Sequence, residues 1–166
     1  VFLQGCNFRC PFCHNSDLLG KDGPQTIPTE ELMTFLKKRV GLLDGVCITG
    51  GEPTLRRELP EFIRKIRQLG YLVKLDTNGS DPDALAALLA TEMIDYVAMD
   101  IKNAKPHYSF TCGIKNFEAM PPRKLTFYGI QHGSVFCKNI VTIEPRKHFL
   151  LEQKLHNTAY LSSSRR

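Results

Sequence analysis

Apolar and polar positions alternate along this chain in a way that predicts interleaved helices and strands. Apolar residues recur at helical spacing in residues 29–39 and 59–69. Asp81-Pro82 marks the start of a third helix. Short runs typical of buried strands occupy residues 45–49, 71–76 and 95–101. The strand centres lie about 25 residues apart, the size of a strand-helix unit, which predicts a parallel sheet, either open or curled toward a barrel.

The helix ends have recognisable signals. Thr29 is predicted to cap the first helix, and Gly70 is predicted to end the second. Asp81 and Pro82 supply the cap and the first-turn proline of the third. Residues 1–4 are expected to form the first strand of the series with its start cut away, because the chain begins on Val1.

The pattern deteriorates after about residue 117. Pro121-Pro122 interrupts the chain where the period requires a helix, although residues 139–143 suit a strand and residues 146–155 a helix. We therefore expect a core over residues 1–117 and an atypical segment over residues 118–166, which is divergent, truncated or frameshifted.

Polar motifs follow each predicted strand. The segment CNFRCPFCHN comes after the first, TGGEP after the second and DTNGS after the third, while Asp100 and Lys102 end the fourth. Loops at the carboxyl ends of strands are where barrels and open α/β sheets place their chemistry. Four motifs at four equivalent places indicate one functional site.

Composition limits the classes of protein. The chain has 166 residues, 42% of them apolar and 23% charged, and no run of eighteen apolar residues, so we expect a soluble globular domain without a membrane span. The net charge is +5, but residues 121–166 hold 8 Lys and Arg against 2 Asp and Glu. A diffuse basic end without interleaved aromatic residues does not favour nucleic-acid binding.

The six cysteines divide into a cluster and three scattered residues. Cys6, Cys10 and Cys13 lie within eight residues, whereas Cys47, Cys112 and Cys137 lack any such spacing and receive no role; Cys47 is expected to be a small buried hydrophobe. Clustered thiols in a chain of this length indicate a metal site in a reducing compartment, and hence a cytoplasmic protein.

Three thiolates suit a multi-metal centre better than a zinc ion. A structural zinc site closes with four ligands, and His14, directly after Cys13, is awkwardly placed to ligate the same ion. In a four-iron cubane, three protein thiolates leave one iron open to a non-protein ligand. A zinc or iron-sulfur binding module without catalysis stays open as an alternative.

The other motifs have ordinary explanations when taken alone. Gly50 and Gly51 permit close backbone approach to a ligand, and Glu52 offers an acceptor to a cation, yet GGEP alone is more often a plain turn. DTNG is also turn chemistry. Asp100 and Lys102 point to one face of a strand, where a surface ion pair is the simple interpretation.

Together the motifs resemble a known family. The spacing CxxxCxΦC, with Phe12 as the aromatic, resembles the cluster motif of the radical S-adenosylmethionine superfamily. The resemblance implies a partial (β/α)6 barrel of the α/β class, a [4Fe-4S] cluster on the three clustered cysteines, and S-adenosylmethionine bound to the open iron. It covers about residues 1–117.

The resemblance also implies roles for the remaining motifs, with Phe12 beside the cofactor. TGGEP is similar to the family's GGE motif, so Gly50, Gly51 and Glu52 are expected to hold the methionine amino group. DTNG resembles the position that contacts the ribose or carboxylate, which makes Asp76 and Asn78 cofactor contacts.

The DxK pair is similar to that of the glycyl-radical-enzyme activating branch, in which it contacts the methionine end of the cofactor; here the pair is Asp100 and Lys102. In that branch the Asp-Thr and the later Asp can also hold a monovalent cation, so Asp76, Thr77 and Asp100 are candidate ligands.

The implied function is that of an anaerobic oxidoreductase. The chain resembles activating proteins of anaerobic ribonucleotide reductase. These proteins cleave S-adenosylmethionine reductively and use the 5′-deoxyadenosyl radical to abstract a glycine hydrogen from a partner glycyl radical enzyme. A flavodoxin- or ferredoxin-type protein would supply the electron, and no acid-base residue is needed. The alternative within the family is an enzyme that acts on a small molecule, such as a deazapurine precursor.

Overall fold

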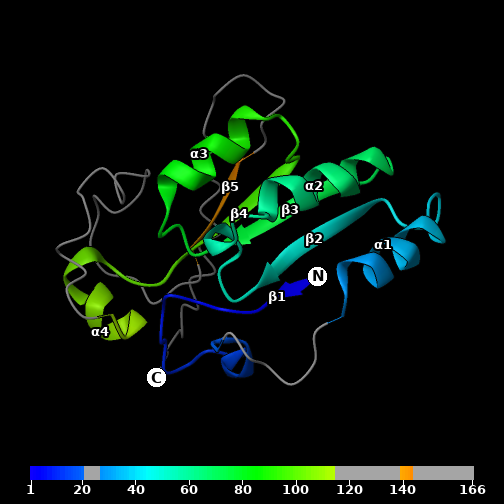
Figure 1. Cartoon of the computed structure of the whole chain (residues 1–166). Helices are drawn as coiled ribbons and strands as arrows, with labels where there is room; N and C mark the ends of the chain where they lie inside the picture. Colours follow the sequence, from blue (N-terminus) through cyan, green and yellow to red (C-terminus); the bar gives the residue numbers. More distant parts are fainter. Residues whose placement is uncertain (21–26, 115–138, 144–166) are drawn as a thin grey trace, which may run out of the picture.

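A five-stranded sheet organises the chain in its computed structural model, which describes residues 1–20, 27–114 and 139–143. The strands are β1 (Phe2–Leu3), β2 (Gly45–Gly50), β3 (Leu72–Thr77), β4 (Tyr96–Ile101) and β5 (Asn139–Ile143). Their spatial order follows their order in the chain (Figure 1). The first four strands are parallel, and β5 pairs with β4 in the antiparallel direction.

Helices connect the parallel strands. They are α1 (Thr29–Lys37), α2 (Leu59–Gln68) and α3 (Pro82–Ala90); a short helix α4 (Tyr108–Cys112) follows β4, and 3₁₀ turns lie at Ser16–Leu18, Pro53–Leu55 and Lys105–His107. Side chains of α1, α2 and α3 share one core with side chains of β2, β3 and β4, so these helices cover the same face of the sheet. A sheet whose strand order never reverses, with its connecting helices on one face, is wound as in a barrel, and the chain forms a partial (β/α) barrel.

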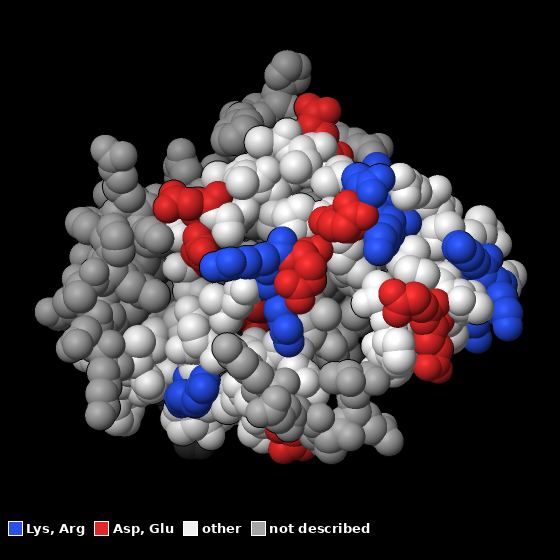
Figure 2. Space-filling model, viewed as in Figure 1, with Lys and Arg blue, Asp and Glu red and all other residues white. Residues whose placement is uncertain are grey.

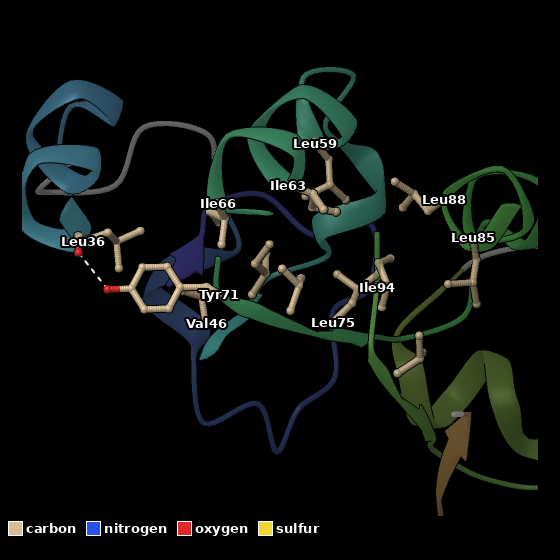
Figure 3. Close-up of a cluster of buried hydrophobic side chains, with 13 residues drawn as sticks. Leu36, Val46, Leu59, Ile63, Ile66, Tyr71, Leu75, Leu85, Leu88 and Ile94 are labelled. Atoms are coloured by element: carbon tan, nitrogen blue, oxygen red, sulfur yellow. Dashed lines mark hydrogen bonds between the residues drawn. The ribbon is translucent and has the colours of Figure 1, made fainter. Parts of the chain in front are cut away.

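The buried core lies between the helices and the sheet (Figure 3). Ile48, Val73, Leu75 and Val97 project from successive strands toward the helices and are at most 1% exposed. The Tyr71 hydroxyl donates a hydrogen bond to the carbonyl of Leu36 at 2.7 Å, which ties the last turn of α1 to the start of β3.

The opposite face of the sheet is polar. Strand side chains alternate, so the residues between the core positions point away from the helices. Apart from the small Ala98, they include Cys47 on β2, Lys74 and Asp76 on β3, and Tyr96 and Asp100 on β4. The register sets Lys74 opposite Cys47 on one side and Tyr96 on the other.

The predicted helices and strands before residue 102 are confirmed, with one correction at a helix end. Thr29 is the first residue of α1 and not its cap, because Pro28 in an extended conformation occupies the cap position and no side chain caps it. Asp81 caps α3 as predicted, since its side chain accepts the N–H of Ala84 at 3.0 Å. Gly70 follows Leu69, the residue that caps the end of α2, and has a φ of +88°.

The last strand of the sheet does not follow the parallel arrangement that the sequence predicts. A strand at residues 139–143 is confirmed, but it runs antiparallel to β4. Pro121-Pro122, Cys137 and the predicted helix at residues 146–155 lie outside the described residues.

Charge is mixed on the surface seen in Figure 2, where basic and acidic side chains are interspersed. All the Lys and Arg residues of the basic C-terminal end lie outside the part of the chain that the structure describes. Within that part, no helix is both long and apolar enough to cross a membrane.

Candidate cofactor and cluster site

The candidate site lies at the carboxyl ends of the parallel strands. In Figure 1 these strands point toward the side where α4 and the blue segment after β1 lie. The motifs that follow β1, β2, β3 and β4 therefore gather at one edge of the sheet, as the sequence predicted.

The cysteine loop is anchored on α4. The N–H of Arg9 donates to the carbonyl of Cys112 at 2.7 Å. Phe8 is 3% exposed and packs edge-on against Tyr108, with ring centroids 6.1 Å apart. Cys10 packs against the apolar group formed by Phe8, Tyr108 and Cys112 as well. An apolar contact of Phe8 and a backbone hydrogen bond of Arg9 thus attach the middle of the cysteine loop to α4.

The three clustered thiols are free and partly exposed. Burial raises the pKa of Cys6, and the charges of Glu52 and Cys13 add to the effect, while the N–H of Phe8 opposes it from 3.4 Å. Burial likewise raises the pKa of Cys10, against the charge of Lys102. The raised pKa values keep the Cys6 and Cys10 thiols protonated at neutral pH until a metal binds them as thiolates.

The donor set fits an iron-sulfur cluster better than a single ion. Among the described residues, no three His, Cys, Asp or Glu side chains converge on one point as a mononuclear metal site requires. A cubane cluster binds each thiolate through a different iron, so its three cysteines need only surround it. Cys6, Cys10 and Cys13 lie close enough to influence one another electrostatically. They would hold a [4Fe-4S] cluster.

The two glycines after β2 pack against the start of the cysteine loop. A Cβ on Gly50 would lie 2.4 Å from the carbonyl oxygen of Leu3, and one on Gly51 would lie 2.2 Å from that of Gly5. The N–H groups of Gly51 and Glu52 donate to the carbonyls of Leu3 and Gly5, both at 2.8 Å. Only glycine permits this approach, which sets the backbone from which Cys6 projects.

Glu52 is fully buried, and both of its carboxylate oxygens accept hydrogen bonds from neighbouring residues. Its Oε1 accepts hydrogen bonds from the hydroxyls of Thr54 and Thr77, at 2.5 and 2.7 Å. Its Oε2 accepts the backbone N–H of Asn78 at 2.6 Å. The sequence did not indicate these contacts, although Thr54 directly follows TGGEP and Thr77 lies within DTNGS. Glu52 therefore joins the loops that follow β2 and β3.

Asn78 connects the third motif to the cysteines. Its Nδ2 lies 3.8 Å from the Cys6 sulfur and donates to Asn7 Oδ1 at 3.0 Å. Asn7 in turn donates to the Ser80 hydroxyl at 2.8 Å. The structure thus brings Cys6, Glu52 and Asn78 together.

Asp100 and Lys102 form an ion pair at the end of β4. Burial alone would lower the pKa of Lys102, but the hydrogen bond and charge of Asp100 raise it above its usual value, with Cys10 and Cys112 also contributing. The ammonium of Lys102 thus lies within electrostatic reach of Cys10, and the fourth motif borders the cysteine loop.

Asp76 is paired with a residue that sequence reasoning missed. Its carboxylate binds the ammonium of Lys74, and the Cys47 thiol lies 3.5 Å from its Oδ2. Cys47 is half-buried among polar groups and is not the buried hydrophobe expected from its mid-strand position. The sequence could have revealed this, because Cys47 lies between the core residues Val46 and Ile48 and the alternation of a strand directs its side chain to the polar face.

Thr77 and Phe12 are the remaining predicted site residues. The Thr77 side chain turns to the helix-covered side of β3, where its hydroxyl donates to Glu52, so the structure does not bring it to Asp76. Phe12, the aromatic of the cysteine motif, is 54% exposed.

Curated proteins similar to this chain carry several activities in their names. A "Putative glycyl-radical enzyme activating enzyme" from Methanocaldococcus jannaschii is 37% identical over 103 residues, which are 61% of this chain and 42% of that protein. A "Probable GTP 3′,8-cyclase" from Thermococcus kodakarensis is 33% identical over 119 residues, 70% of this chain and 38% of that protein. The 7-carboxy-7-deazaguanine synthase of Aquifex aeolicus is 40% identical over 80 residues, 48% of this chain and 35% of that protein.

The chain spans less than half the length of each of these relatives. The family model of the radical SAM superfamily matches residues 1–120, which contain all four motifs. Members of this superfamily use a [4Fe-4S] cluster and S-adenosylmethionine. The chain therefore belongs to the radical SAM superfamily.

Proposed function

We propose that this chain carries the core of a glycyl-radical-enzyme activating enzyme of the anaerobic ribonucleotide reductase type. Cys6, Cys10 and Cys13 would hold the [4Fe-4S] cluster, which would supply one electron for the reductive cleavage of S-adenosylmethionine and so the radical chemistry that removes a hydrogen atom from a glycine of the partner. The chain's own residues bind, orient and shield the cofactor.

The observation that carries the proposal is the convergence of three motifs on the cysteine loop. Asn78 contacts Cys6, the Lys102 ammonium acts on Cys10, and the Gly50-Gly51 backbone sets the approach to Cys6. A molecule that ligates an iron at this loop would meet groups from β2, β3 and β4 at once.

Each motif then has a role on the cofactor. Gly50, Gly51 and Glu52 hold the methionine amino group; the Oε2 of Glu52 accepts one hydrogen bond from the described residues and has a lone pair for a second. Asp76 and Asn78 contact the ribose or carboxylate.

The DxK pair and the aromatic of the cysteine motif complete the site. Asp100 and Lys102 bind the methionine end, since the ammonium of Lys102 can pair with a carboxylate. Phe12 lies in the loop beside the cluster cysteines and would cover the bound cofactor.

A glycyl radical enzyme as partner is supported by the name of the M. jannaschii relative and by the DxK pair at the end of β4. A flavodoxin- or ferredoxin-type donor in the cytoplasm would supply the electron.

The second candidate function is that of a radical SAM enzyme that acts on a small molecule such as a deazapurine precursor. The A. aeolicus relative, named as a deazaguanine synthase, supports that candidate.

Anaerobic reconstitution of the chain with iron and sulfide tests the cofactor chemistry. We expect 5′-deoxyadenosine from S-adenosylmethionine in the presence of a strong reductant, and none from the Cys10→Ala variant. One tightly bound zinc ion and no cleavage would overturn the enzymatic proposal.

Electron paramagnetic resonance separates the two candidates. The reconstituted protein is incubated with an anaerobic ribonucleotide reductase, and a glycine-centred radical is the expected signal. A deazapurine product from a purine-derived precursor, with no radical on the reductase, would support the small-molecule candidate instead.

A further inference from the structure

Lys74 is held in place from three directions on the polar face of the sheet. Its ammonium pairs with the carboxylate of Asp76, which is two residues further along β3 and therefore on the same face. From β2, the sulfur of Cys47 lies 3.7 Å from Lys74 Nζ. From β4, the ring of Tyr96 lies with its centroid 5.9 Å from the same nitrogen.

These three neighbours are the groups that stabilise a cation. A carboxylate supplies the opposite charge, an aromatic face attracts an ammonium through its quadrupole, and a sulfur accepts a weak hydrogen bond. The strand register produces the arrangement, because Lys74 is paired with Cys47 on one side and with Tyr96 on the other. The Lys74 ammonium thus occupies a cation site built from three strands.

The same carboxylate is a candidate ligand for a monovalent metal cation, but the arrangement around it does not suit such an ion. Asp76 Oδ1 binds Lys74 and Oδ2 faces the Cys47 thiol. Asp100 is paired with Lys102, and the Thr77 hydroxyl is bonded to Glu52 on the other side of the strand. An alkali cation between the two carboxylates would add a positive charge beside two ammonium groups.

We propose that the Lys74 ammonium is the resident cation of the Asp76 carboxylate, so that S-adenosylmethionine binds to this chain without an alkali metal cation. The inference rests on the cofactor site of the proposed function and not on its protein partner. Lys74 acts as a positioning residue: it neutralises Asp76 and holds its carboxylate facing the cofactor.

The test measures S-adenosylmethionine affinity by equilibrium dialysis of the anaerobically reconstituted protein. Tetramethylammonium chloride is compared with potassium or sodium chloride at constant ionic strength. The unmodified protein should show a dissociation constant that changes by less than about twofold between salts. Lys74→Met should bind roughly tenfold more weakly in tetramethylammonium and recover with potassium or sodium, because a small ion can then take the vacated place.

Lys65→Met is the matched control, since it removes the same charge from an exposed position on α2. It should bind the cofactor as the unmodified protein does in every salt. Iron content and circular dichroism establish that the variants are folded and loaded.

Three results would overturn the proposal. These are an alkali-cation requirement in the unmodified protein, an unchanged affinity of Lys74→Met in tetramethylammonium, and no cofactor binding by the unmodified protein in any salt. Because no partner protein is present, a failure to activate a glycyl radical enzyme leaves this result unaffected.

Discussion

The buried carboxylate of Glu52 accepts the backbone N–H of Asn78 at 2.6 Å, and this contact joins the loops that follow β2 and β3. The same carboxylate takes two threonine hydroxyls on its other oxygen. Two motifs separated by more than twenty residues in the chain are thus tied through one acidic side chain, which makes Glu52 a structural residue as well as a proposed cofactor contact.

Replacing Glu52 by Gln is expected to lower the free energy of unfolding by about 1–3 kcal/mol, because an amide cannot supply acceptors on both sides and leaves a buried donor unsatisfied. Urea denaturation of the metal-free protein measures the change. Glu58→Gln is the control: Glu58 is exposed and its ion pair with Arg56 is long at 3.7 Å, so the change should stay within about 0.5 kcal/mol. Equal effects at the two positions would contradict the role of Glu52.

Adding a methyl group to Gly51 is expected to displace the cysteine loop, since its Cβ would lie 2.2 Å from the Gly5 carbonyl oxygen. Gly51→Ala should lose about 1–3 kcal/mol of stability and bind less iron on reconstitution. Gly41→Ala is a suitable comparison, because Gly41 has open space but a φ of +81°. It should cost about 1–2 kcal/mol through backbone strain alone and leave iron content unchanged. Full iron content in Gly51→Ala would contradict the prediction.

Single alanine replacements of Cys6, Cys10 and Cys13 are each expected to abolish the cluster, because two thiolates cannot retain it. Cys47→Ala should keep the cluster, since Cys47 contacts Asp76 and Lys74 on the polar face of the sheet. Iron and sulfide analysis with visible absorption measures the outcome. Cluster loss in Cys47→Ala, or retention in any of the other three, would show that the ligand set is different.

The stability of the reduced, metal-free protein is expected to fall as pH rises above about 8.5, where an unfolded thiol ionises. Burial raises the pKa of Cys112, and the charge of Cys10 raises it further. The folded thiol therefore keeps its proton when the unfolded one loses it, and this difference lowers the free energy of unfolding by up to about 1.4 kcal/mol per pH unit.

Urea denaturation between pH 7.5 and 9.5 measures this slope. Cys112→Ala should be less stable at neutral pH but show a shallower decline, because the most strongly buried thiol with a raised pKa is then absent. Parallel slopes would mean that Cys112 ionises normally in the folded state.

Much of the fold follows from short-range patterns. The apolar spacing of α2 and the cap of α3 were legible because each depends on residues within a few positions. The wrong cap at Thr29 shows the limit of this approach: Pro28 takes the extended cap conformation, and a proline preceding a threonine does not reveal which of them precedes the first helical turn.

The direction of β5 was beyond local patterns. An apolar run at residues 139–143 predicts a strand, but its partner and orientation depend on how the preceding chain returns to the edge of β4. The polar surroundings of Cys47 were likewise hidden, since they depend on the pairing of β2 with β3.

By itself, the sequence determined where the helices and strands lie, that the motifs fall at the carboxyl ends of parallel strands, and that three thiols share one loop, because these features are encoded by residues close together in the chain. Only the tertiary structure decided which distant side chains meet. The pairing of strands set Lys74 between Cys47 and Tyr96. Close packing of the glycines against residues 3–5 placed Glu52 beside Asn78. Such contacts arise from register and packing across the sheet, which no local pattern of residues specifies.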